Sequence, residues 1–240
     1  MDLDFTGINQ RPDDIYALSE MLLTGSQKDT FPYDTEVLGV PMVVLADVFS
    51  PKYLMGAEPF TRMLDVQPGI DFLEIGPGTG AIAVHAALAG ARRVLAIDIN
   101  PAAVANTQAN IEKHGVADRM EVRQGDIFSA LRPGETFDVI FWNVPFGYVE
   151  PGYEPTPLQR SCLDPGYEAT RRYIHEGPRH LSPGGRLLLG FSSAIGRLEL
   201  VERIADEEGM EARIVATEPP PPDFPMPMPL ELIQFVPRTG

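Results

Sequence analysis

Four polar residues in this sequence stand at or near the ends of short apolar runs, where their side chains could do chemistry: Glu74, Asp98, Asp126 and Asn143. The three carboxylates can accept hydrogen bonds from hydroxyl or amino groups, and the asparagine can both donate and accept them. The apolar runs are typical of buried parallel strands. Because ligands of open α/β sheets bind outside the carboxyl ends of the strands, these side chains are candidates for one shared site.

A glycine-rich turn follows the first of these runs. Residues 72–75 predict a buried strand, Gly76, Gly78 and Gly80 turn the chain, and residues 81–90 predict a helix. Glycine adopts positive φ without a Cβ clash and lets the backbone approach a ligand closely. The unpaired N–H groups at the start of the helix point into the same space. This strand, turn and helix predict the beginning of a nucleotide-binding α/β unit.

The rest of the chain after residue 60 alternates between helical and strand patterns, which predicts a mainly parallel sheet covered by helices on both faces. We expect a doubly wound, Rossmann-like α/β fold with seven strands, at residues 72–75, 94–98, 120–124, 137–142, 186–191, 211–217 and 230–236. The last two strands have only a proline-rich connection, residues 219–229, between them, so they should pair antiparallel. Helices are expected at residues 58–64, 81–90, 102–114 and 198–209, and a further helix, after the loop at 147–166, is expected to end at about residue 180.

Residues 1–59 differ from this pattern and predict a small cap before the main domain at 60–240. A proline and two acids, at residues 12–14, open a helical pattern that ends at residues 24–26. Residues 36–44 are typical of a hairpin that turns near Gly39. The cap could bury an edge of the main sheet, or it could form a wall of a substrate pocket.

Composition and charge restrict the partners and the location. The chain has 240 residues and a formal net charge of −15, and such an acidic surface disfavours nucleic acid as a partner. No apolar run is long enough for a membrane span, no signal peptide is visible, and Cys162 is the single cysteine. We therefore expect a cytoplasmic protein without disulfides. The four histidines do not have metal-ligand spacing, so we expect no metal site.

The glycine turn fits two classes of enzyme. Asp98 lies 20 residues after Gly78, where a nicotinamide dehydrogenase places the acid that binds a ribose. Three features argue against a dehydrogenase. Glu74 lies inside the first strand, the chain ends in an antiparallel pair, and the fourth strand stops at residues 143–146.

The combined motifs resemble the class I S-adenosylmethionine (SAM)-dependent methyltransferases, over residues 60–236. The resemblance rests on Glu74-x-Gly76-x-Gly78-x-Gly80, on Asp98 and Asp126, and on Asn143-Val144-Pro145-Phe146. Within this class the chain is most similar to the release-factor glutamine N-methyltransferases, which have an Asn-Pro-Pro-Tyr motif. Residues 48–52 also resemble the Ile-Pro-Arg segment of that group. Val144 and Phe146 replace the proline and the tyrosine, so the acceptor need not be glutamine.

The resemblance implies SAM as the cofactor and assigns its contacts. The backbone from Gly76 to Gly80 would pass under the methionine and ribose portions, and Glu74 would hold the methionine amino group. The ribose hydroxyls would bind Asp98 next to Ile99, and the adenine amino group would bind Asp126, with Ile127 near the ring. These acids also admit structural roles: a buried acid held by backbone N–H groups for Glu74, a helix cap for Asp98 and a turn aspartate for Asp126.

The segment from Asn143 to Phe146 would determine the reaction. The Asn143 side-chain oxygen and the Val144 carbonyl can each accept one N–H of a planar amide or amino group, which aims its nitrogen at the methyl group. Pro145 stiffens the segment, and Phe146 offers a flat face to a planar acceptor. This predicts N-methylation of a protein or a small molecule. An O- or C-methyltransferase of specialised metabolism and a non-catalytic SAM-binding module remain alternatives.

A long loop follows this segment, at residues 147–166, and it is rich in proline, glycine and tyrosine. Tyr148, Tyr153 and Tyr167 lie in it or next to it. A long aromatic loop beside a site often serves as a lid, so we expect a lid here, with a solvated connection as the alternative.

Overall fold

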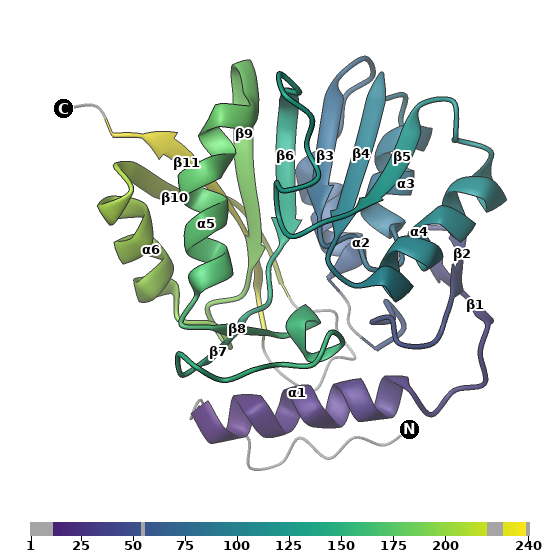
Figure 1. Ribbon diagram of the computed structural model, residues 1–240, viewed down its shortest axis with the longest axis horizontal. Helices are drawn as coiled ribbons and strands as arrows, with labels where there is room; N and C mark the ends of the chain where they lie inside the picture. Colours follow the sequence, from purple (N-terminus) through teal and green to yellow (C-terminus); the bar gives the residue numbers. More distant parts are fainter. Residues whose placement is uncertain (1–11, 54–55, 220–227, 239–240) are drawn as a thin grey trace.

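The computed structural model describes residues 12–53, 56–219 and 228–238, and its central element is a seven-stranded sheet (Figure 1). The elements, in chain order, are α1 (Pro12–Ser26), β1 (Tyr33–Val37), β2 (Val40–Val44), α2 (Ala57–Leu64), β3 (Asp71–Ile75), α3 (Ala81–Leu88), β4 (Arg93–Asp98), α4 (Pro101–His114), β5 (Met120–Gln124), β6 (Phe137–Asn143), β7 (Gly147–Val149), η1 (Gln159–Ser161), β8 (Leu163–Pro165), α5 (Glu168–Glu176), η2 (Gly177–His180), β9 (Leu181–Phe191), α6 (Leu198–Glu207), β10 (Met210–Glu218) and β11 (Leu230–Pro237).

The strand order of the main sheet is β10-β11-β9-β6-β3-β4-β5. The strands from β9 to β5 are parallel, and β11 pairs antiparallel with both β9 and β10. The predicted seven-stranded doubly wound sheet with an antiparallel C-terminal pair is therefore confirmed. Most of the proline-rich connection between β10 and β11, residues 220–227, lies outside the described residues.

The helices cover both faces of the sheet because the strands are apolar on both sides. In β3, Phe72 belongs to the cluster under α2, α3 and α4, whereas its neighbour Leu73 belongs to the cluster under α5 and α6. Successive side chains of a strand point to opposite faces, so a continuous apolar run serves both layers. Glu74 therefore lies on the α3 side of the sheet, beneath the start of that helix.

Two segments differ from the sequence-based expectation. The turn expected before residue 186 lies inside β9: Phe137 pairs with Leu181 and Val139 with Arg186, so residues 182–185 bulge opposite a single residue of β6. The expected loop at 147–166 contains two short strands, β7 and β8, which pair parallel, and the 3-10 helix η1. Pairing partners far along the chain produce both features, and local patterns do not reveal them.

The N-terminal helix and hairpin both form, but the hairpin does not cover an edge of the main sheet. It packs on α3 and α4, where His85 Nε2 lies 2.9 Å from the Val37 carbonyl. Val37 and Met42 of the hairpin are fully buried in the same cluster as Phe72. In Figure 1 the purple helix α1 lies across the end of the molecule that carries β7 and β8. The boundary at residue 60 stays a prediction.

Two buried asparagines of α4 hold the hairpin. Asn110 accepts a hydrogen bond from the Val43 N–H (2.8 Å) and donates to the carbonyls of Val43 and Thr79 (both 2.9 Å). Asn106 accepts from the Leu45 N–H and donates to the Val43 carbonyl (both 2.8 Å). These amides satisfy backbone groups at the inner edge of β2 that no third strand pairs.

In the described part of the chain, none of the helices has the length and apolar character needed to cross a bilayer.

Replacing Asn110 with alanine should lower the free energy of unfolding by about 1–3 kcal/mol, because the Val43 N–H loses its acceptor in a buried site. Urea denaturation would measure the change. The control is Gln108→Ala on the same helix, since Gln108 is exposed and, within the described residues, its side chain bonds only Glu112. Equal stability of the two variants would contradict the anchoring role of Asn110.

Candidate functional site

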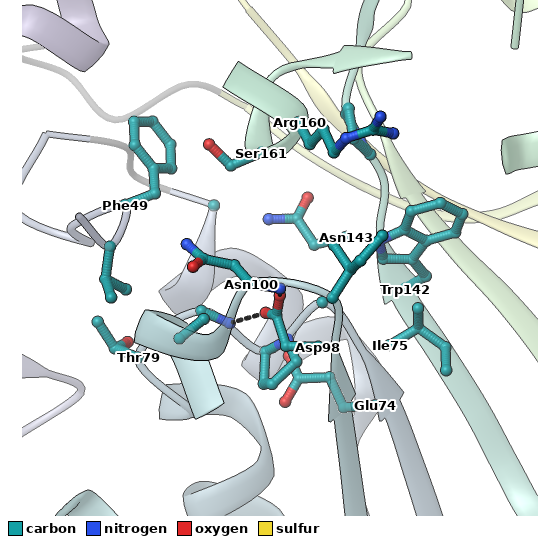
Figure 2. Close-up of a pocket in the computed structure, with 18 of the residues that line it drawn as sticks. Phe49, Glu74, Ile75, Thr79, Asp98, Asn100, Trp142, Asn143, Arg160 and Ser161 are labelled. Atoms are coloured by element: carbon teal, nitrogen blue, oxygen red, sulfur yellow. Dashed lines mark hydrogen bonds between the residues drawn. The ribbon is translucent and has the colours of Figure 1, made fainter. Parts of the chain in front are cut away.

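A cavity of about 210 Å³ opens at the carboxyl ends of β3, β4, β5 and β6 (Figure 2). Its position is the topological switch point of the sheet, because the chain leaves β3 toward β4 on one side and returns to β6 on the other. Segments 48–51 and 157–163 add walls to the cavity. The cavity brings Glu74, Asp98, Asp126 and Asn143 together, as the sequence predicted.

The glycine turn forms the floor of this cavity. Gly76, Gly78 and Gly80 have φ of 61°, 58° and 81°, a left-handed backbone that disfavours other residues. A Cβ at Gly76 would lie 2.9 Å from Trp142 Nε1, and one at Gly80 would lie 2.8 Å from Thr107 Cγ2. A Cβ at Gly78 would instead meet only a carbonyl oxygen at 3.9 Å. The turn is therefore packed from behind and open toward the cavity.

Glu74 is a buried acid on this floor. Its Oε2 accepts a hydrogen bond from the Ala83 N–H at 2.8 Å, in the first turn of α3. Burial raises the pKa of Glu74 to about 8, the Ala83 N–H opposes that shift, and the negative charge of Asp98 adds to it. The hydrogen bond satisfies one oxygen, as a structural acid requires, and Oε1 makes no hydrogen bond with the described part of the chain.

Asp98 closes β4 beside the turn. Its Oδ2 accepts from the Gly78 N–H (3.2 Å) and its Oδ1 from the Asn100 N–H (2.9 Å). Burial raises the pKa of Asp98 to about 6, partly offset by the backbone N–H groups of Asn100, Gly78 and Ile99. The cap of α4 is Asn100, whose side chain accepts from the Ala102 N–H, so Asp98 is not needed as the helix cap. Each carboxylate oxygen keeps a lone pair for a ligand.

Asp126 lies at the rim, and its carboxylate already has a partner. Its Oδ2 accepts from Arg172 Nη1 at 2.6 Å, and its backbone N–H donates to Ser129 Oγ at 2.8 Å. The hydrogen bond to Ser129 belongs to a turn, which agrees with the structural role of turn aspartate expected for Asp126. Ile127 is buried with φ of 52°, whereas Ile99 leaves 41% of its surface exposed at the cavity.

Asn143 points toward the centre of the cavity, between the floor and the roof (Figure 2). Its Oδ1 is buried and has no hydrogen-bond partner in the described part of the chain. A buried acceptor without a partner costs free energy, so this oxygen is a candidate to accept a hydrogen bond from a bound molecule. Pro145 and Phe146 also line the cavity, but the side chain of Val144 turns into the core, and its N–H donates to the Gly190 carbonyl at 3.3 Å.

The structure adds two features that the sequence did not indicate. Tyr167, expected beside a lid, is fully buried and braces the Asn143–Phe146 segment: its hydroxyl donates to the Phe146 carbonyl (2.6 Å) and accepts from the Arg197 N–H (3.0 Å). The expected lid is a structured roof in which Arg160 and Ser161 face the cavity. Both features depend on contacts between distant segments, so the aromatic composition was their only local signal.

These residues fit a nucleoside that carries an amino acid. The open turn admits a close ligand, Asp98 offers two oxygens and Glu74 offers one. The Asn143 oxygen has no partner within residues 12–53, 56–219 and 228–238. The described residues include no group of three or more His, Cys, Asp or Glu side chains that could hold a metal ion.

Residues 72–161 match the family model of a methyltransferase domain. A release factor glutamine methyltransferase of Cereibacter sphaeroides is 37% identical over 150 residues, which cover 59% of this chain and 50% of the relative. A putative protein N5-glutamine methyltransferase of Methanocaldococcus jannaschii is 28% identical over 175 residues, 70% of this chain and 84% of the relative. The 16S rRNA methyltransferase of T. thermophilus, solved in complex with AdoMet and guanosine, has a TM-score of 0.59 at 18% identity, over 86% of this chain and 50% of that one.

The chain spans about half the length of the release factor glutamine methyltransferases that it matches. The structural likeness shows the Rossmann-like methyltransferase fold, and the family match includes the glycine turn, Asp98, Asp126 and Asn143. These findings confirm that the chain resembles the class I SAM-dependent methyltransferases and, among them, the release-factor glutamine methyltransferase group, with S-adenosylmethionine as the cofactor.

Proposed function

We propose that this protein is a SAM-dependent methyltransferase that methylates a planar amide or amino nitrogen of a protein or a small molecule. The observation that carries the proposal is Asn143, which lines the cavity and whose buried Oδ1 has no hydrogen-bond partner among the described residues. The names of the relatives support an amide nitrogen in a protein, because they are glutamine methyltransferases. Residues 60–240 form the catalytic unit in this proposal, and residues 1–59 supply part of the cavity wall through segment 48–51.

Bound SAM supplies an electrophilic methyl group on a sulfonium. In this proposal Asp98 accepts hydrogen bonds from the ribose hydroxyls, and Glu74 holds the methionine amino group through its free Oε1. Asp126 accepts a hydrogen bond from the adenine amino group, and Ile127 lies near the ring. The ion pair with Arg172 uses Oδ2 of Asp126, so Oδ1 is left for the adenine. The open face of Gly78 lets the backbone lie directly under the ligand.

The chain's contribution to methyl transfer is to hold the acceptor nitrogen. An amide nitrogen is a poor nucleophile because its lone pair is delocalised. Asn143 Oδ1 and the Val144 carbonyl accept its two N–H groups, fix its direction and stabilise the positive charge that develops on it. Phe146 meets the flat face of the acceptor, and its ring is held edge-on against Phe191 at 5.7 Å between centroids.

Asp98→Asn should weaken binding of S-adenosylhomocysteine (SAH) at least tenfold, because the charge-assisted hydrogen bonds to the ribose lose their charge. Calorimetry would measure the affinity, with the exposed Asp118→Asn as the control. Unchanged affinity in Asp98→Asn would place the ribose elsewhere.

The SAH affinity of the wild type should fall as the pH drops below about 6, because Asp98, whose pKa is raised to about 6, is then protonated and loses the charge that strengthens its hydrogen bonds. Asp98→Asn should remove this fall in SAH affinity. It should keep the separate fall in affinity that occurs as the pH drops through about 8, where Glu74, whose pKa is about 8, loses its charge. Calorimetric titrations between pH 5 and 9 would check both statements. A wild-type affinity that rises on acidification would contradict the sign of this argument.

Asn143→Ala should lower turnover at least 100-fold, the range for losing one preorganised partner of the transition state, and leave SAH affinity within a few-fold. The assay transfers label from SAM to a cell extract that is then divided into protein, RNA and small-molecule fractions. Label in a fraction with wild type but not with Asn143→Ala would identify the acceptor class. Equal losses of turnover and of SAH affinity would mean that Asn143 is not the acceptor-holding residue.

Tyr167→Phe should lower kcat several-fold at unchanged SAH affinity, because the Phe146 carbonyl loses the hydroxyl that fixes its segment. The matched control is Tyr173→Phe. The Tyr173 hydroxyl is equally buried but bonds the carbonyls of Ile140 and Leu188 in the sheet. Both variants should lose about 1 kcal/mol of stability, whereas only Tyr167→Phe should lose turnover. Equal kcat in the two variants would exclude a positioning role for Tyr167.

A further inference from the structure

Arg160 is a cation at a cavity whose other charged lining residues, within the described part of the chain, are acids. Among the described residues that line the cavity, Arg160 is the only lysine or arginine, and the acids are Glu74, Asp98, Asp126 and Asp164. The Arg160 guanidinium makes no hydrogen bond or ion pair with the described part of the chain. Two arginines that are not among the lining residues do pair: Arg172 binds Asp126, and Arg197 binds Glu199.

The acids of the cavity all have other partners. Asp164 accepts from the Thr170 hydroxyl (2.7 Å) and the Thr170 N–H (2.9 Å), and Asp126 is paired with Arg172. Glu74 and Asp98 accept from backbone N–H groups on the floor. None of them neutralises Arg160, so its charge is available to a ligand.

The segment that carries Arg160 is held in place by contacts on both sides. At the start of η1 the Gln159 N–H donates to Thr156 Oγ1 (3.2 Å), and the Gln159 side chain accepts from the Thr156 N–H (2.8 Å). Gln159 also donates to Glu20 of α1, and at the other end the Gly147 N–H donates to the Cys162 carbonyl (2.8 Å). Figure 2 shows the result: Arg160 lies on the roof, across the cavity from Asp98, and Asn143 lies between the two in this view.

We propose that Arg160 forms a carboxylate subsite at the acceptor end of the cavity. A planar guanidinium binds a carboxylate through two parallel N–H···O bonds. The Arg160 side chain is exposed, and the contacts of Gln159 and Cys162 hold the backbone that carries it. The proposal rests on the proposed methyltransferase function. Two ligands could bring the carboxylate: the methionine portion of SAM, or a methyl acceptor that carries an acid near its amide.

Two pairs of probes distinguish these sources. The first pair is SAH and 5′-methylthioadenosine, which lacks the amino-acid carboxylate. The second pair is N-acetyl-L-glutamine and its α-amide, titrated into protein saturated with SAH; both carry the planar side-chain amide and only the first carries a carboxylate. Calorimetry would compare the wild type with Arg160→Gln and Arg160→Lys. The control is Arg203→Gln, which removes an exposed charge from α6, away from the cavity.

Arg160→Gln should lower the affinity for one of the two carboxylate ligands about tenfold and leave the affinity for the matching ligand without a carboxylate unchanged. Arg160→Lys should cause a smaller loss of affinity. A loss for SAH alone identifies the carboxylate of the cofactor, and a loss for N-acetyl-L-glutamine alone identifies that of the acceptor. If the wild type binds SAH but Arg160→Gln changes neither ligand, the subsite is overturned and the methyltransferase proposal stands. If the wild type does not bind SAH, the methyltransferase proposal itself fails.

Discussion

The arrangement of the site depends on the left-handed backbone of one turn. Positive φ at Gly76, Gly78 and Gly80 reverses the chain within a few residues, so α3 begins directly above the strand that precedes it. Two N–H groups that would otherwise lack partners then meet carboxylates: the Ala83 N–H meets Glu74, and the Gly78 N–H meets Asp98. The neighbouring helix α4 fixes the carbonyl side of the turn, through Thr107 and Asn110. A side chain at these glycines would need a strained backbone and, at two of them, would collide with a neighbour.

Burial of two acids in one cavity has an electrostatic consequence. The pKa of Glu74 is raised to about 8 and that of Asp98 to about 6, because removing a carboxylate from water disfavours its charged form. A ligand with positive charge offsets this cost, since an opposite charge nearby favours the ionised acid. SAM carries a sulfonium and an ammonium group, so under the proposed function the cofactor supplies the charge that the floor of the cavity lacks.

The side of the cavity opposite the glycine turn is built by contacts between segments that lie far apart in the chain. Asn143 reaches the cavity because β6 lies between β3 and β9. Its segment is fixed through Tyr167, which joins Phe146 to the start of α6. The pairing of β7 with β8 brings η1 over the cavity, and α1 supports η1 through Glu20. The floor thus holds its groups by local hydrogen bonds, whereas the acceptor side depends on tertiary contacts.

The sequence by itself determined the positions of the core strands along the chain, the glycine turn, the helix after Asp98 and the positions of the polar strand ends. These features are local, because strand periodicity, glycine conformation and helix caps involve residues within a few positions of one another. Only the tertiary structure decided that the hairpin rests on α4 through Asn106 and Asn110, that residues 182–185 bulge within β9, and that Tyr167 is a buried brace. It also decided that Asn143 Oδ1 has no partner among the residues that the structure describes, because an atom's lack of a hydrogen bond depends on everything packed around it.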